Sequence, residues 1–107
     1  MSSQKKIIRA KFRASVFDRD KFKCRMCDHK PEMVEELDAH HITDRALMPN
    51  GGYVPENGIA LCPICHLRAE QFHRDGRAFP GYSPDDLYRK IGSSKEIATE
   101  ASEKLGA

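Results

Sequence analysis

Two Cys-x-x-Cys pairs constrain the fold of this 107-residue chain more than any other feature. One pair is Cys24 and Cys27, and the other is Cys62 and Cys65. Four thiolates complete the tetrahedral coordination of one zinc ion and leave no position open for water. A chain of this length buries only about 60–70% of the surface that its unfolded form exposes, so a bound metal would add stability to a modest apolar core. We therefore predict one structural zinc ion between the two pairs.

The sequence favours a reducing compartment. It starts with MSSQKK, which lacks the apolar segment of a secretory signal. It also contains no run of about 18 apolar residues that would cross a membrane. In the cytosol, cysteines are thiols or metal ligands rather than disulfides. We therefore expect a cytoplasmic protein with no membrane partner.

Positive charge is concentrated near the N-terminus. Residues 1–30 contain ten Lys or Arg and three Asp, whereas residues 31–107 contain eight basic and thirteen acidic residues. Apolar side chains recur four positions apart in residues 4–18, a pattern that predicts a helix. A basic helix is suited to phosphate backbones, although a solvated charged helix explains the same charge equally well. The candidate nucleic-acid contacts are Arg9, Lys11, Arg13, Arg19, Lys21 and Lys23.

Residues 36–42 predict a short strand that contains two adjacent histidines. Successive side chains of a strand point to opposite faces. If Leu37 and His41 lie on one face, His40 lies on the other. The two histidines should therefore have different surroundings and different roles.

Five further segments complete the expected architecture. A loop rich in Gly, Pro and Asn precedes a second strand at residues 58–61, and Pro63 is suited to the first turn of a helix that runs to about residue 74. Ser83 predicts the N-terminal cap of a helix over residues 83–92. Residues 93–107 predict either a weak helix or a frayed tail.

In this order, the motifs resemble the HNH endonucleases of the zinc-bearing type. The resemblance rests on the two cysteine pairs, on the run Ala39-His40-His41-Ile42, and on the run from Asn57 to His66. It implies a small α+β fold, a ββα-metal (His-Me finger) core held by a four-cysteine zinc site, with flanking N- and C-terminal helices. The implied domain organisation is a single HNH nuclease domain of residues 1–107, with a basic N-terminal helix (1–16), a core (about 17–76), a C-terminal helix (83–92) and a tail (93–107).

The resemblance also implies roles for individual residues. His40 and His66 take the positions of ligands to a catalytic divalent cation, and His41 takes the position of the general base. Asn57 is expected to hold the loop and the base histidine through its amide. Glu70 is a candidate third ligand, because it lies four residues after His66 on the same helix face. His73 also lies on that face, but about 10 Å along the axis from His66, so an exposed or phosphate-contacting histidine is the favoured interpretation.

The implied function is metal-dependent hydrolysis of DNA phosphodiester bonds, with Mg²⁺, Mn²⁺, Ni²⁺ or Zn²⁺ as the catalytic cation. Imidazole ligands favour the softer ions of this set. The family abounds in phages, mobile elements and restriction systems, so we expect bacterial or phage-infected host cytosol, with a targeting or packaging protein as a further partner. Substrate preference, single- or double-strand cleavage and oligomeric state stay open.

Three other interpretations compete with a nuclease. A non-catalytic zinc-stabilised module that binds nucleic acid or protein would need the cysteines and the basic segment, but not all of the histidines and Asn57. The run from Cys62 to His66 also matches a c-type haem attachment sequence. Haem would leave the first cysteine pair unexplained and requires an export signal. A thioredoxin-like redox role lacks the βαβ pattern that accompanies it.

Overall fold

The computed structural model describes residues 2–106, and within them a two-stranded sheet is combined with four α-helices. The elements in chain order are α1 (Ser2–Arg19), β1 (Asp38–His41), β2 (Gly58–Leu61), α2 (Pro63–Asp75), α3 (Pro84–Lys90) and α4 (Lys95–Glu103). This is the small α+β fold with a ββα unit that the sequence predicts. None of the helices in the described part of the chain is long and apolar enough to span a membrane.

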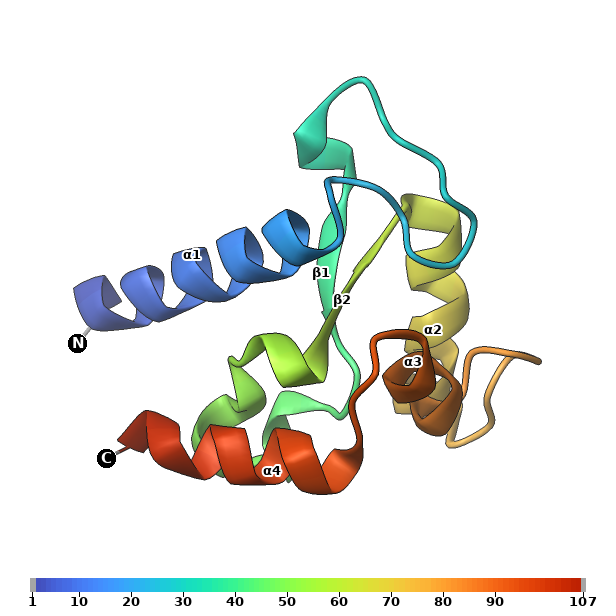
Figure 1. Cartoon of the computed structure of the whole chain (residues 1–107). Coiled ribbons are helices and arrows are strands. Elements are labelled where there is room, and N and C mark those ends of the chain that lie inside the picture. The colour runs from blue at the N-terminus through green and yellow to red at the C-terminus, as the bar shows by residue number, and fades with distance from the viewer. Residues whose placement is uncertain (1, 107) are drawn as a thin grey trace.

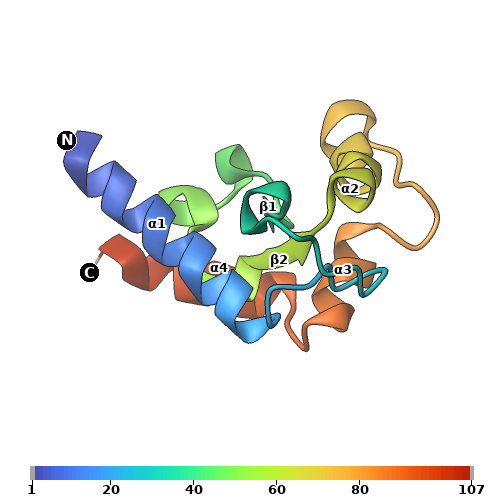
Figure 2. The same cartoon turned by 90° about the horizontal axis from the view of Figure 1, so that it is seen from above.

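The β-hairpin lies between α1 and α2, as the two views in Figure 1 and Figure 2 agree. Its strands are antiparallel, with Asp38 opposite Leu61 and His41 opposite Gly58. β1 is shorter than the predicted strand because residues Val34–Glu36 form a 3-10 turn before it. The chain after β2 continues directly into α2, so the two strands and this helix form one unit.

The core is divided between the two faces of the hairpin. On the α1 side, Phe12, Val16 and Phe17 pack with Leu37 and Ala60. On the other side a larger cluster covers the sheet, and it contains Cys24, Ile42, Met48, Ile59, Leu61, Cys62, Cys65, Ala69, Tyr82, Leu87, Tyr88 and Ala98. Leu37 and Ile42 therefore face opposite sides, which confirms the predicted alternation along β1.

The helix ends follow the chemistry of their capping residues. In α3 the Ser83 hydroxyl accepts a hydrogen bond from the Asp86 N–H at 3.1 Å, and the Asp86 carboxylate accepts one from the Ser83 N–H at 3.2 Å. This capping box confirms Ser83 as the N-cap. α2 ends at Gly76, which adopts the left-handed conformation (φ 73°) that a residue without Cβ tolerates best.

The C-terminal segment is a helix rather than a frayed tail. Ser94 caps α4 by accepting a hydrogen bond from the Ile97 N–H, and Ala98 and Ser102 on this helix are buried. α4 packs against the turns Pro49–Gly52 and Pro55–Asn57 of the loop between the strands. It also accepts a 3.0 Å hydrogen bond from Asn50 at the Ser102 carbonyl. The loop between the strands is therefore held against a helix.

Candidate active site and metal centre

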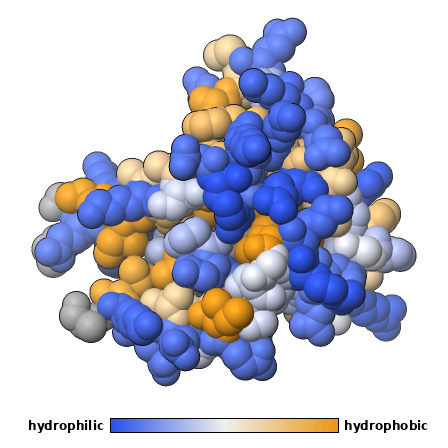
Figure 3. Space-filling view, in the orientation of Figure 1, coloured by the Kyte–Doolittle hydropathy of each residue, from blue (hydrophilic) through white to orange (hydrophobic). Residues whose placement is uncertain are grey.

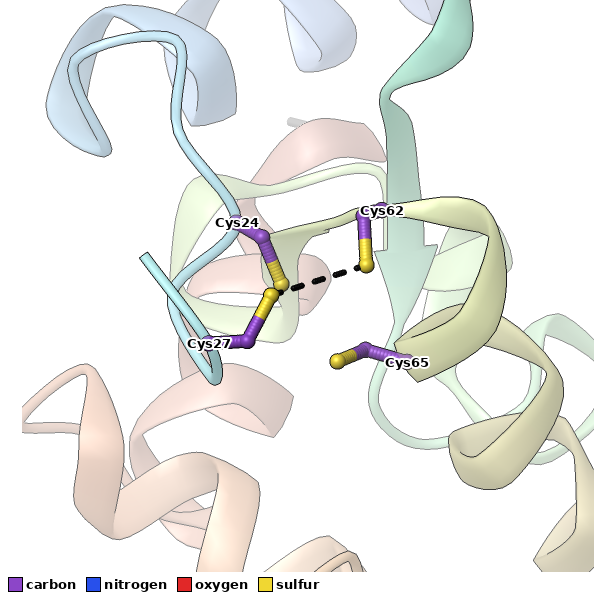
Figure 4. A group of neighbouring side chains, drawn as sticks. All are labelled: Cys24, Cys27, Cys62 and Cys65. Carbon is purple, nitrogen blue, oxygen red and sulfur yellow. Dashed lines mark hydrogen bonds between the residues drawn. The ribbon is translucent and has the colours of Figure 1, made fainter. Parts of the chain in front are cut away.

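The four cysteines come together in one cluster. Cys24 and Cys27 lie on the turn after α1, Cys62 follows β2 as the N-cap of α2, and Cys65 lies in the first turn of α2. Figure 4 shows the four sulfur atoms pointing toward a common centre, and all of them lie within 4.8 Å of one another. The Cys27 and Cys62 Sγ atoms are 3.7 Å apart. Tetrahedral zinc with Zn–S bonds of about 2.3 Å requires sulfurs about 3.8 Å apart, so the cluster fits the predicted structural zinc.

The surroundings of Cys65 disfavour a thiolate that has no cation beside it. Burial raises the pKa of the Cys65 thiol to about 12, although this sulfur accepts a 3.2 Å hydrogen bond from the Tyr82 hydroxyl. A thiolate is therefore favoured at this position only when a cation compensates its charge. Cys24, Cys62 and Cys65 are buried, whereas Cys27 is exposed. The described cysteines form no disulfide.

A buried carboxylate attaches the first cysteine turn to the sheet. Asp20 accepts hydrogen bonds from Arg19, from Arg25 and from the Ala60 N–H, at 2.7 to 2.8 Å. Arg19 also donates to the carbonyls of Pro55 and Gly58, both at 2.7 Å. The guanidinium of Arg19 is thus engaged in internal bonds, and its contact with nucleic acid stays a prediction.

His40 is the central residue of a second polar cluster, on the α2 side of the hairpin. Its side chain is almost fully buried (residue exposure 2%), and neither ring nitrogen has a hydrogen-bond partner. Its Nδ1 lies 3.1 Å from Oε2 of Glu70, but the orientation does not form a hydrogen bond. Burial lowers the pKa of His40, which leaves a neutral ring with a lone pair. The close approach of the His40 nitrogen favours the charged form of Glu70 and lowers the pKa of its carboxyl, so this carboxylate is charged near neutral pH.

His66 lies beside the same carboxylate. Its Nε2 is 3.6 Å from Oε2 of Glu70, and its Nδ1 is 3.1 Å from Oδ2 of Asp38. The rings of His40 and His66 have centroids 5.2 Å apart. The structure thus brings the two sequence-predicted ligands and Glu70 to one face of the hairpin. A carboxylate at the Nδ1 side of His66 favours a proton there and a free lone pair on Nε2.

His73 lies inward, in contrast to the exposed position that the sequence favoured. Its ring stacks on that of His40, with centroids 5.1 Å apart and an interplanar angle of 19°. Its Nε2 is 2.9 Å from the carbonyl oxygen of His41, to which it donates a hydrogen bond. His40, Glu70 and His73 form the group in which every potential ligand atom lies within 4.8 Å of the others.

His41 faces α1, on the opposite side of the hairpin. Its ring stacks on Phe12, with centroids 4.4 Å apart, and the ring of Tyr53 meets it edge-on at 4.7 Å. Nε2 is buried without a hydrogen-bond partner, so Nδ1 is the nitrogen available to accept a proton. Burial, assisted by the positive charge of Arg45, lowers the pKa of His41 to about 4. The ring is therefore neutral near pH 7, as a general base requires.

A hollow of about 300 Å³ opens beside His41. Its lining residues are Arg9, Phe12, Arg13, Asp38, Ala39, His41, Arg45 and Tyr53. Arg45 and Tyr53 were not recognised from the sequence. They lie in the loop between the strands and are joined by a 2.9 Å hydrogen bond from the guanidinium to the hydroxyl. No local pattern marks them, because their position depends on the path of that loop.

A second hollow, of about 690 Å³, continues along α1 and is lined by Lys5, Ile8, Arg9, Arg45 and Leu105 among others. The face in Figure 3 is largely hydrophilic, with hydrophobic side chains exposed between α1 and α4. Lys11, Lys21 and Lys23 are exposed but line neither hollow. Of the predicted phosphate contacts, Arg9 and Arg13 thus lie closest to the histidines.

Asn57 supports the site from the interior. It is completely buried, and its amide donates to the carbonyls of Thr43 and Gly52 and accepts from the Thr43 N–H and the Tyr88 hydroxyl. It therefore holds the loop that follows His41, as predicted. It makes no hydrogen bond to the His41 ring, so its geometry is that of a residue that positions the loop, and its part in catalysis stays a prediction.

These features define a ββα fold with a four-cysteine cluster that fits zinc and with a histidine and carboxylate cluster between β1 and α2. A family model described as HNH endonuclease matches residues 24–72, which contain all four cysteines, Asn57 and the histidines from 29 to 66. The chain is therefore similar to the HNH endonucleases over this segment, and the clustering of the four cysteines is consistent with the zinc-bearing form of that family. The family is generally one of nucleases. Comparisons with curated proteins and with solved structures gave no match.

Proposed function

We propose that this protein is a metal-dependent endonuclease that hydrolyses phosphodiester bonds in DNA. The proposal is supported above all by the different surroundings of the two adjacent histidines of β1. His40 points into a cluster of metal-ligand residues, whereas the adjacent His41 borders an open hollow lined by three arginines. A cation site and a neutral base are therefore one residue apart on opposite faces of one strand.

Asp38 connects the two faces. It lines the hollow beside His41, and its carboxylate also lies 3.1 Å from the His66 ring. A phosphodiester in the hollow would thus lie near both histidine groups. Arg9, Arg13 and Arg45 supply the positive charge that attracts the phosphate backbone.

The proposed roles follow from these positions. His40, His66 and Glu70 hold the divalent cation, which when bound neutralises negative charge on the phosphate and on the leaving oxygen. His41 accepts the proton of the attacking water at Nδ1. A bound phosphate favours the protonated imidazole, so it raises the pKa of His41 from its low value toward the working pH. Two or three imidazole and carboxylate ligands leave room for water and substrate.

Residues 1–107 act as one nuclease domain in which α1 contributes basic contacts. The thiolate zinc site is suited to a reducing cytosol.

The test is cleavage of a supercoiled plasmid by the zinc-loaded protein with Mg²⁺, Mn²⁺ or Ni²⁺, and with chelator added to a parallel reaction. We expect cation-dependent nicking, and a rate lower by about 100- to 10,000-fold for His41→Gln. His29→Gln, which changes an exposed histidine outside both clusters, is the matched control. A folded wild-type protein that binds DNA but cuts with none of these cations would instead be a non-catalytic zinc-stabilised module.

A further inference from the structure

The ring nitrogens of His40 are buried without hydrogen-bond partners, which points to a bound cation. Burial of a polar group is unfavourable unless another group compensates it. Glu70 approaches Nδ1 to 3.1 Å without forming a hydrogen bond. Two ligand atoms on one metal ion, at bonds of about 2.0–2.1 Å, are separated by about 3.0–3.4 Å, so this spacing fits a shared cation.

His73 has the orientation of a ligand to the same cation. Because its Nε2–H donates to the carbonyl oxygen of His41, the lone pair of the neutral ring is on Nδ1. Histidines that bind metals commonly donate their second ring N–H to a backbone carbonyl in this way. The ring also stacks on that of His40, and one of its nitrogens lies within 4.8 Å of a potential ligand atom of His40 and of Glu70.

The geometry of α2 explains how a residue seven positions after His66 reaches the cluster. His66, Glu70 and His73 lie on successive turns of one helix face. His73 follows Glu70 by three residues, so the two side chains are neighbours on this face. His66 and His73 are about 10 Å apart along the helix axis, and Glu70 lies between them.

We propose that His73 is a further ligand of the catalytic cation, so that His40, Glu70 and His73 form its inner protein ligands and His66 joins them from the Asp38 side. This inference rests on the proposed nuclease function and specifies its metal site. Imidazoles with one carboxylate favour Mn²⁺, Ni²⁺ or Zn²⁺ over Mg²⁺. The hydrogen bond from His73 to the His41 carbonyl also links the cation site to the peptide of the base.

The first experiment measures Mn²⁺ binding by isothermal titration calorimetry, with the full-length protein already loaded with structural zinc. We expect His73→Gln to weaken Mn²⁺ binding tenfold or more, as Glu70→Gln does, while His29→Gln binds like the wild type. Each variant is checked for one zinc per chain and for an unchanged far-UV circular dichroism spectrum. Wild-type affinity in folded His73→Gln, together with weakened binding in Glu70→Gln, would overturn the inference.

A second measurement uses the unmutated protein and so does not depend on the folding of a variant. Two-bond proton–nitrogen NMR spectra report the state of each imidazole nitrogen. On addition of one further equivalent of Zn²⁺, we expect the Nδ1 resonance of His73 to shift while Nε2 stays protonated. An unchanged His73 ring beside a shifted His40 ring would contradict the ligand role. If the wild type nicks plasmid in that case, only this inference fails; a wild type that neither binds Mn²⁺ nor nicks contradicts the proposed function as well.

Discussion

Surroundings, rather than residue type, distinguish the two adjacent histidines of β1. His40 lies beside the carboxylate of Glu70 and two further imidazoles, whereas His41 lies between the rings of Phe12 and Tyr53. Burial lowers the pKa of both, so each is neutral near pH 7. One neutral ring is placed to bind a cation and the other to accept a proton. A difference of one residue in strand register would exchange these environments.

Asn57 determines where the loop after His41 lies, and its replacement tests this. Asn57→Ala would leave three buried groups without this partner, namely the Thr43 N–H and the carbonyls of Thr43 and Gly52, and would leave the Tyr88 hydroxyl with the Thr43 hydroxyl alone. Because unpaired buried polar groups are costly, we expect the free energy of unfolding of the zinc-loaded protein to fall by about 2–4 kcal/mol, as measured by urea denaturation.

Tyr88→Phe provides the control for this prediction. It removes the hydroxyl that donates to Asn57 at 2.6 Å and lies 2.6 Å from the Thr43 hydroxyl, but it keeps the buried ring. We expect a smaller loss, of about 1 kcal/mol. An equal loss in the two variants would show that the amide of Asn57 is not the main support of the loop.

At the scale of elements, α1 reaches the hairpin because β2 begins with a glycine. A Cβ on Gly58 would lie 2.5 Å from Cγ2 of Val16 and 2.7 Å from Cε1 of Phe12, which is too close for packed carbon atoms. We therefore expect Gly58→Ala to push α1 outward and to lower the free energy of unfolding by about 1–3 kcal/mol, measured by urea denaturation. Phe12 stacks on His41, so plasmid nicking should fall in parallel.

The double variant Gly58→Ala/Val16→Ala separates this clash from other effects of the new methyl group. If the clash is the cause, removing the Val16 methyl groups relieves part of it. The double variant will then lose less free energy of unfolding than the sum of the losses in the two single variants. Additive losses would instead assign the effect of Gly58→Ala to a change within β2.

Predictability from the sequence differed between elements for physical reasons. β2 and the start of α2 were predicted at their observed residues, because Gly58 and Pro63 mark these boundaries locally. α4 was left open, since its buried residues Ala98 and Ser102 are small and give no apolar pattern. The inward position of His73 depends on its tertiary contacts with β1, which spacing along the axis alone does not show. Arg45 approaches His41 only through the folded path of its loop, which tertiary hydrogen bonds determine.

At the scale of the whole molecule, the cysteine cluster joins segments that are distant in the sequence. The turn that carries Cys24 and Cys27 is attached to the sheet by the bonds of Asp20 and by the Arg25 N–H to the Ala60 carbonyl. Structural zinc contributes about 10–16 kcal/mol to folding in small domains, which equals or exceeds the total stability of about 5–15 kcal/mol typical of a domain. We therefore expect Cys65→Ser to lose zinc and to unfold, as measured by elemental analysis and circular dichroism.

Chelation of the wild-type protein provides an independent check of this prediction. Removal of zinc by a strong chelator should abolish the cooperative thermal transition, and addition of zinc should restore it. Mn²⁺ should not restore it, because thiolates favour zinc over harder cations. A zinc-free protein that melts as the zinc-loaded form does would show that the fold does not depend on the cysteine cluster.

The distribution of charge over the molecule leads to a matched comparison of two pairs of basic residues. Arg9 and Arg13 line the hollow beside His41, whereas Lys21 and Lys23 are exposed and line neither hollow along α1. Arg9→Gln/Arg13→Gln and Lys21→Gln/Lys23→Gln both remove two positive charges, so net charge changes equally. If DNA crosses the hollow, only the arginine pair contacts phosphates. We expect its replacement to weaken DNA binding and to reduce the slope of log affinity against log salt by about 1.8, since each phosphate contact contributes about 0.9. The lysine variant should keep the wild-type slope in the same fluorescence-anisotropy titration, and equal reductions in both variants would mean that net charge, rather than the hollow, attracts the DNA.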